Sequence, residues 1–457
     1  MIERLMREAP EALVQLVLTM QEEMTRLRAD IGRLQARVEE LEAQNRPPSA
    51  PFRRGEKERK SDPKKPGRKK GHPGSYRKVP EVIDEVIEVP LCGCPQCAGA
   101  LEGVTPIVQY IEELPVVRPQ VTRLTTYEGY CPQCDQIMRS SHARQTSSAG
   151  GCAGVQLGAR ALAVAAELKH GMGLTLRKTA QSLHLLGGLK VSAGGLAQAF
   201  TRMAGKLAPE DTALVKALNQ APVVHSDETS WWKNNAPASL WVFTTPGQEG
   251  LTLYRVVDHR DRVTFHDILS PNYPGLLISD CLSVYDTATD HQHKCYAHHL
   301  KALQIAERDQ NPASAAVDHW IGRVRAFFTD AMAMKKQMPG MEATDVEAHR
   351  ALLETRANTL FGAPRGDPAQ ERLRNRIAKQ RDHLLTFLDH EAAEATNNLA
   401  ERQLRGAVIA RKLSCGNKTD RGAATWQILA SLSATCTQRA IDFVTFVTPR
   451  LSLLPAG

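Results

Sequence analysis

The sequence predicts a mixed α/β domain in the second half of the chain, preceded by a helical segment, a basic arm, a small metal-binding β segment and a helical region. Three features lead to this prediction. A strict heptad of apolar residues fills residues 10–45, two Cys-Pro-Gln-Cys pairs begin at Cys94 and Cys131, and two later apolar runs lead into Ser-Asp at Asp227 and Asp280. Because helical and strand periodicity occupy different parts of the chain, several domains are expected.

The composition is that of an ordinary globular protein with one strongly basic segment. Hydrophobic residues make up 42% of the 457 residues and charged residues 24%, and the formal net charge is +8. Residues 53–78 hold 12 basic and 3 acidic side chains, so this segment supplies the whole positive excess. No apolar run approaches the roughly 18 residues of a membrane span, and the start of the chain lacks the apolar core of a signal peptide. Ten cysteines are too few for a disulfide scaffold, so a cytoplasmic protein is expected.

Residues 1–46 are predicted to form a coiled coil through which copies of the chain associate. Spacings of four and three alternate along the apolar residues Leu13, Val17, Met20, Met24, Leu27, Ile31, Leu34, Val38 and Leu41. A stripe as narrow as this is what a coiled coil buries between its helices. The alternative is a single amphipathic helix that packs on the protein's own core.

Residues 47–82 are predicted to be an extended basic arm for nucleic acid. A Pro-rich stretch ends the helix, and the densest part of the arm, residues 64–74, has no apolar residue that could form a core. Its densest charge lies at Lys64, Lys65, Arg68, Lys69 and Lys70. Such arms bind phosphates largely without sequence preference. The alternative is a solvated charged linker.

Residues 83–145 are predicted to bind structural zinc. The ligands would be Cys94, Cys97, Cys131 and Cys134, with Cys92 as a spare ligand. Four thiolates in two such pairs suit a closed tetrahedral site, in outline a zinc ribbon. Strand-like runs at residues 104–110 and 121–127 lie between the pairs.

Residues 146–215 are predicted to be helical and to contact DNA. Within them, residues 175–196 have the pattern of a helix, a Gly turn and a second helix capped by a serine. This pattern is typical of a helix-turn-helix, and a plain helical hairpin would show it equally well.

Two aspartates follow apolar strands and are candidate metal ligands. Residues 222–229 and 275–280 each run from an apolar strand into Ser-Asp, at Asp227 and Asp280, and further strand-like runs lie at residues 240–245 and 251–257. Neighbouring strand ends converge, and carboxylate oxygens suit Mg²⁺ or Mn²⁺.

Glu401 is the third candidate, in a helical run. Asn398, Glu401 and Arg405 are spaced so that they share one helix face, and Arg402 adds a second guanidinium for phosphate. Two Asp and one Glu can hold two ions for phosphodiester chemistry. Each acid would otherwise be a helix cap or a surface charge. Asp258 and Asp290 compete for the role but lack the strand-then-Ser context.

These motifs resemble those of the insertion sequence sixty-six transposase family, which are large bacterial transposases with an Asp-Asp-Glu triad. The likeness rests on His-Ser-Asp-Glu-Thr-Ser-Trp at residues 225–231, Ile-Ser-Asp at 278–280, Asn-Asn-Leu-Ala-Glu-Arg at 397–402 and Arg-Lys followed by a Gly-rich stretch at 411–423. The coiled coil, the basic arm and the cysteine pairs also resemble the family's layout. Cys281 departs from it, because the family more often has a small or polar residue there.

The resemblance implies a ribonuclease-H-like core over residues 216–457 with Asp227, Asp280 and Glu401 as its triad and Mg²⁺ or Mn²⁺ as its cofactor. Because 121 residues separate the last two acids, residues 302–390 are expected to be an all-helical insertion. The implied function is cleavage of DNA at the 3′ ends of a mobile element and their transfer to target DNA. This would take place at the bacterial nucleoid, with accessory proteins of the element as further partners. Two alternatives stay open: an inactive or domesticated zinc-containing DNA-binding protein, and a metal-dependent nuclease on the same core.

Cys295 and His298 open the expected insertion. Their Cys-x-x-His spacing is similar to a motif of related transposases with such insertions. We expect a packed structural pair that supports the active-site strand, with zinc binding as the alternative.

Overall fold

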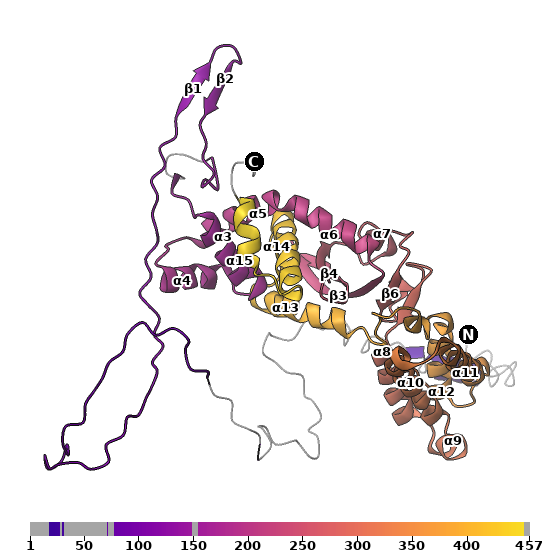
Figure 1. Cartoon of the computed structure of the whole chain (residues 1–457). Helices are drawn as coiled ribbons and strands as arrows, with labels where there is room; N and C mark the ends of the chain where they lie inside the picture. The colour runs from indigo at the N-terminus through magenta and orange to yellow at the C-terminus, as the bar shows by residue number, and fades with distance from the viewer. Residues whose placement is uncertain (1–17, 28–29, 32–70, 72–76, 149–153, 452–457) are drawn as a thin grey trace, which may run out of the picture. The chain divides into compact units, whose positions relative to one another are not determined.

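The computed structural model describes residues 18–27, 30–31, 71, 77–148 and 154–451 (Figure 1). They fall into two compact units, Met1–Leu114 and Pro115–Gly457, each described here by itself. In these residues, no helix is long and apolar enough to cross a membrane.

The described part of the first unit contains a piece of the predicted coiled coil. Residues 18–27 and 30–31 are helical, and the heptad residues Met20, Met24, Leu27 and Ile31 are exposed. The remainder of the heptad lies outside the described residues, as do Lys64, Lys65, Arg68, Lys69 and Lys70 of the arm. Self-association and nucleic-acid binding by these segments stay predictions.

The prediction of strands between the cysteine pairs is wrong. Residues 104–110 and 121–127 form no strand in the structure, and their apolar side chains are exposed. The hairpin of this region lies later, in the second unit, where β1 (Glu128–Cys131) pairs antiparallel with β2 (Gln136–Arg139). A β-branched sequence favours extended backbone, but a strand also needs a partner for its N–H and C=O groups.

The second unit is built on a five-stranded mixed sheet. Its strands are β3 (Val223–Lys233), β4 (Ala236–Thr244), β5 (Thr252–Val257), β6 (Leu276–Ser279) and β7 (Gln292–Lys294). Their order across the sheet is β5-β4-β3-β6-β7. The first three form an antiparallel meander, and β6 and β7 then add in parallel on the other side of β3. Asn234 and Asn235 turn β3 into β4 with φ of 54° and 60°, as a tight hairpin requires.

Strand alternation gives the sheet two buried faces. In β4, Trp241 and Phe243 point to one face while Leu240 and Val242 point to the other. The Trp241 face packs on helices that precede the sheet, and the Leu240 face packs on α13 (Asn398–Ser414) and α14 (Asp420–Gln438). Figure 1 shows α13 and α14 beside β3 and β4.

The helices before the sheet form the predicted helical region. They are α3 (Ala159–Ala166), the π-helix η2 (Glu167–Gly171), α4 (Leu176–Gly187), α5 (Ala193–Lys206) and α6 (Ala208–Gln220). Gly188 ends α4 in a left-handed conformation with φ of 64°, and the Ser192 side chain accepts from the Gly195 amide to cap α5. The shorter helices α7 (Arg262–His266) and α15 (Phe443–Val447) complete this layer.

Helices alone fill the described residues between β7 and α13. They are α8 (Tyr296–Asp309), α9 (Pro312–Val317), α10 (Trp320–Gln337), α11 (Ala343–Gly362) and α12 (Pro368–Ala378), with short 3-10 turns around them. Figure 1 shows them gathered beyond β6. Their own hydrophobic cluster reaches the sheet at Val223, Leu276 and Ile278.

Two contacts fix the points where the chain enters and leaves these helices. The Tyr296 amide, at the start of α8, donates to the Ala395 carbonyl at 2.9 Å. The buried ring of His293 on β7 contacts the same carbonyl at 3.1 Å. The segment just before α13 is therefore held against the end of β7.

Candidate active site

The two predicted aspartates lie side by side at one edge of the sheet. Strands β3 and β6 are parallel neighbours with His225 opposite Ile278, so Asp227 and Asp280 each follow two residues later on the same face. A backbone amide holds each carboxylate: Glu228 donates to Asp227 Oδ1 and Leu282 donates to Asp280 Oδ1, both at 2.9 Å. The two aspartates are close enough that the charge of Asp280 acts on Asp227.

Glu401 reaches the same face from α13. It lies in the first turn of this helix, whose Ala400 and Leu404 pack against Trp231 and Leu240 of the sheet. This packing requires small and aliphatic residues at helical spacing, which the Asn-Asn-Leu-Ala-Glu-Arg stretch supplies. The helix places Glu401 close enough that its charge acts on Asp227.

The pKa of Asp227 is raised from its ordinary value to about 7. Burial is the largest cause, followed by the charge of Glu228, with smaller contributions from Asp280 and Glu401. A divalent cation would remove this penalty, because it neutralises the carboxylates that repel one another. Oxygen ligands from two Asp and one Glu fit Mg²⁺ or Mn²⁺.

Replacing Asp227 by Asn should raise the melting temperature in EDTA at pH 8 by on the order of 5 °C. A carboxyl whose pKa rises from 3.8 to about 7 on folding is destabilising once it ionises, by at most about 4 kcal/mol. The unfolded state loses its proton first, so stability falls as pH rises from about 4 to about 7. The gain from D227N should therefore shrink toward pH 5. Thermal scans across this range check it, with exposed Asp290→Asn as the matched control; an equal shift at pH 5 and pH 8 would contradict it.

Asn397 rather than Asn398 supports the site from within. Asn397 is fully buried: its Nδ2 donates to the Ser226 carbonyl at 2.7 Å, its Oδ1 contacts His225 Nδ1 at 3.2 Å and its amide donates to Cys295 Sγ at 3.1 Å. Asn398, the residue that the helical spacing selected, is exposed. Sequence spacing missed Asn397 because its partners are distant in the chain.

Two further ionisable groups near the aspartates, Glu228 and Lys294, were not predicted as site residues. Glu228 points to the opposite face of β3, where it accepts from Tyr285 Oη at 2.6 Å and pairs with Arg260. Lys294 on β7 is fully buried, and its Nζ donates to Ser279 Oγ at 3.2 Å, one residue before Asp280. Burial lowers the pKa of Lys294 to about 8. Because successive side chains of a strand point to opposite faces, the sequence alone could have shown that Glu228 lies on the face opposite to Asp227.

The predicted phosphate ligands lie on the exposed side of α13. Arg402 and Arg405 are exposed on its first two turns, near Glu401. A third guanidinium, Arg411, donates instead to Thr229 Oγ1 at 3.1 Å and Ser230 Oγ at 2.6 Å, so it joins α13 to β3.

Cys295 and His298 come together with Glu401. One ligand atom from each of the three residues lies within 4.8 Å of the others. The sequence predicted the Cys295–His298 pair but gave no reason to place Glu401 beside it.

The two Cys-Pro-Gln-Cys pairs adopt the same local turn. Cys94 and Cys97 belong to the first unit and Cys131 and Cys134 to the second. The residue after each pair, Ala98 or Asp135, has a positive φ, 57° and 52°. In each pair, backbone amides that point at the first sulfur lower the pKa of that thiol. Such turns suit thiolate ligands; the shared zinc ion remains a prediction.

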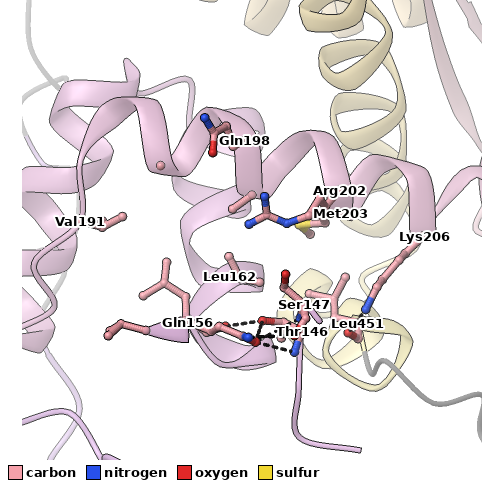
Figure 2. Close-up of a pocket in the computed structure, with 14 residues that line it drawn as sticks. Thr146, Ser147, Gln156, Leu162, Val191, Gln198, Arg202, Met203, Lys206 and Leu451 are labelled. Atoms are coloured by element: carbon pink, nitrogen blue, oxygen red, sulfur yellow. Dashed lines mark hydrogen bonds between the residues drawn. The ribbon is translucent and has the colours of Figure 1, made fainter. Parts of the chain in front are cut away.

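A hollow of about 240 Å³ lies away from the acids and is lined by α5 and by residues 146–147 and 155–157 (Figure 2). Arg202 and Lys206 line it. Gln156 also lines it, and its Oε1 accepts hydrogen bonds from the backbone amides of Thr146 and Ser147. Its lining holds no carboxylate, thiol or imidazole. It therefore offers no acid–base pair, and the carboxylate edge of the sheet is the better candidate for catalysis.

Comparison with known proteins identifies the family of the chain. The sequence model of the family described as Transposase IS66 family matches residues 154–425, more than half of the chain. The match runs from the helices before the sheet into α14 and includes all three acids. No curated protein matches the chain. The chain therefore belongs to the IS66 family of transposases.

Proposed function

We propose that this chain is a DNA transposase that cuts the 3′ ends of its mobile element and joins them to target DNA, with Asp227, Asp280 and Glu401 as metal ligands. One observation carries the proposal. Asp280, directly after β6, and Glu401 on α13 lie close enough to Asp227 on β3 that their charges raise its pKa, in addition to the larger effects of burial and of Glu228. Carboxylates that repel one another do not stabilise a fold. Metal-dependent phosphodiester chemistry, in contrast, requires several carboxylates close together as ligands.

The sheet supports a ribonuclease-H-like core. An antiparallel meander followed by two parallel strands, with the acid-bearing strands adjacent, fits the fold that the family resemblance implies. The all-helical stretch between β7 and α13 accounts for the long spacing before Glu401.

The protein's own groups have separate tasks in this mechanism. Asp227, Asp280 and Glu401 would hold the cations, and the amides of Glu228 and Leu282 each donate to one aspartate and so fix its orientation. Bound Mg²⁺ ions supply activation of the attacking oxygen and stabilisation of the leaving oxygen. Arg402 and Arg405, exposed beside Glu401, suit the phosphates of the bound strand.

The remaining segments would hold DNA and pair subunits. The two identical cysteine turns support a structural zinc ion, and α4 and α5 with their capped turn support a helix-turn-helix. The exposed heptad residues on 18–31 support association of two copies, which brings two element ends together.

The chain should join DNA ends in Mg²⁺ and not in EDTA. The substrate is a labelled duplex from the DNA that flanks its own gene, incubated with a supercoiled plasmid as target. Joined products that carry the labelled 3′ end are expected. Cutting without joining would replace the proposal with a nuclease, and binding without either would replace it with an inactive DNA-binding protein.

A further inference from the structure

We propose that Cys295, His298 and Glu401 form a zinc site at the junction of α8 and α13, which has only Glu401 in common with the Asp227–Asp280–Glu401 triad. The shared role of Glu401 rests on the proposed function. The site itself rests on the three ligand atoms, which lie within 4.8 Å of one another.

The chemistry of the ligands selects the ion. A thiolate, an imidazole and one carboxylate are typical zinc ligands, whereas Mg²⁺ prefers oxygen alone. Zinc bonds of about 2.0–2.3 Å place tetrahedral ligands about 3.3–3.8 Å apart, so side-chain movements on the order of 1 Å close the site. Three protein ligands leave a fourth position for water.

Burial raises the pKa of the Cys295 thiol, but three backbone amides around the sulfur act in the opposite direction. Cys295 precedes the first turn of α8, so the amides of Ala297 and His298 point at it, and the Asn397 amide donates to it at 3.1 Å. These donors favour the ionised sulfur. Zinc binding then releases the thiol proton to water and leaves the imidazole neutral and the carboxylate ionised.

His298 and Glu401 each have a group that a cation at this site would stabilise. The Nδ1 atom of His298 is buried and meets no hydrogen-bond partner in the described part of the chain. The charge of Glu401 opposes ionisation of Cys295. A cation between these groups would give the imidazole a partner and turn the repulsion between the sulfur and the carboxylate into attraction.

The neighbouring thiol provides a control. Cys281 Sγ lies 3.7 Å from His299 Nε2, close to the site in sequence and also within the catalytic domain. No carboxylate joins this pair among the metal-ligand groups that the described residues form. Cys281 should therefore not contribute to zinc binding.

The test is the zinc content of the full-length protein and its variants after dialysis against Zn²⁺. Wild type should retain one more equivalent than Cys295→Ser, which preserves an acceptor for the Asn397 amide. Cys281→Ser should match wild type. Zn²⁺ should raise the melting temperature of wild type more than that of Cys295→Ser, and Mg²⁺ should not reproduce the difference.

His298→Ala is a second test of the zinc site that can be used if Cys295→Ser fails to fold. His298→Ala changes a partly exposed side chain and should also lose one equivalent. Asp227→Asn should keep it. A folded Cys295→Ser or His298→Ala with the wild-type zinc content would overturn the zinc site and leave the transposase proposal intact. If these variants lose one equivalent of zinc but the wild-type protein joins no DNA, the zinc site stands and the transposase proposal fails.

Discussion

Replacing Asp227 by Asn should lower metal-dependent cutting and joining by on the order of a thousandfold, equivalent to about 4 kcal/mol in the activation barrier. The amide keeps the size of the side chain and its contact with the Glu228 amide but cannot hold a cation as a carboxylate does. Asp280→Asn and Glu401→Gln should have effects of the same order. End-joining rates on a labelled duplex measure the loss, and gel-shift titrations should show DNA binding within about twofold of wild type.

Asp258→Asn is the matched control for these variants. Asp258 was one of the two competing acids in the sequence, and it is exposed and forms an ion pair with Lys233. Its variant should join DNA at the wild-type rate. Retention of metal-dependent cutting by D227N would show that the triad is misassigned.

Replacing Asn397 by Ala should lower the free energy of unfolding by about 2–4 kcal/mol and slow end joining more than tenfold. The amide of Asn397 contacts the Ser226 carbonyl and the His225 ring, both buried, and its loss leaves these groups without a partner. The same residue precedes α13, so its loss also loosens the position of Glu401. Urea titration measures the first effect and end-joining assays measure the second.

Asn398→Ala provides the comparison. Asn398 is the next residue in the chain and is exposed, so its variant should change both measurements little. Equal effects of the two variants would mean that the role of Asn397 comes from helix initiation and not from its buried contacts.

Local patterns in the sequence were enough to locate the strands that hold the aspartates. An apolar run that leads into Ser-Asp predicted β3 and β6; Asp280 directly follows β6 as expected, whereas β3 continues past Asp227 to Lys233. The full length of β3 was not predicted, although Asn234 and Asn235 are a recognisable hairpin signal. Residues 104–110 failed as a strand because pairing depends on a partner that local composition does not reveal.

The contacts that assemble the site depend on distant residues, so the sequence indicated them poorly. Asn397 meets residues more than 170 positions away, and only the folded chain distinguishes it from Asn398. The buried charge of Lys294 likewise has no local signature, because lysines rarely lie fully inside a protein. Glu401 was located correctly on a helix, but its neighbours Cys295 and His298 belong to another one.

The two contacts to the Ala395 carbonyl keep the entropy cost of the long spacing before Glu401 small. The Tyr296 amide and the His293 ring both contact this carbonyl. The helices from Tyr296 to Ala395 therefore form a loop whose two ends are in contact. Doubling the length of a closed loop costs only about 0.6 kcal/mol. The outer helices can therefore lengthen, shorten or diverge without displacing the third carboxylate. Relatives of this chain are then better recognised by the residues at the two ends of the loop than by the number of residues between their acids.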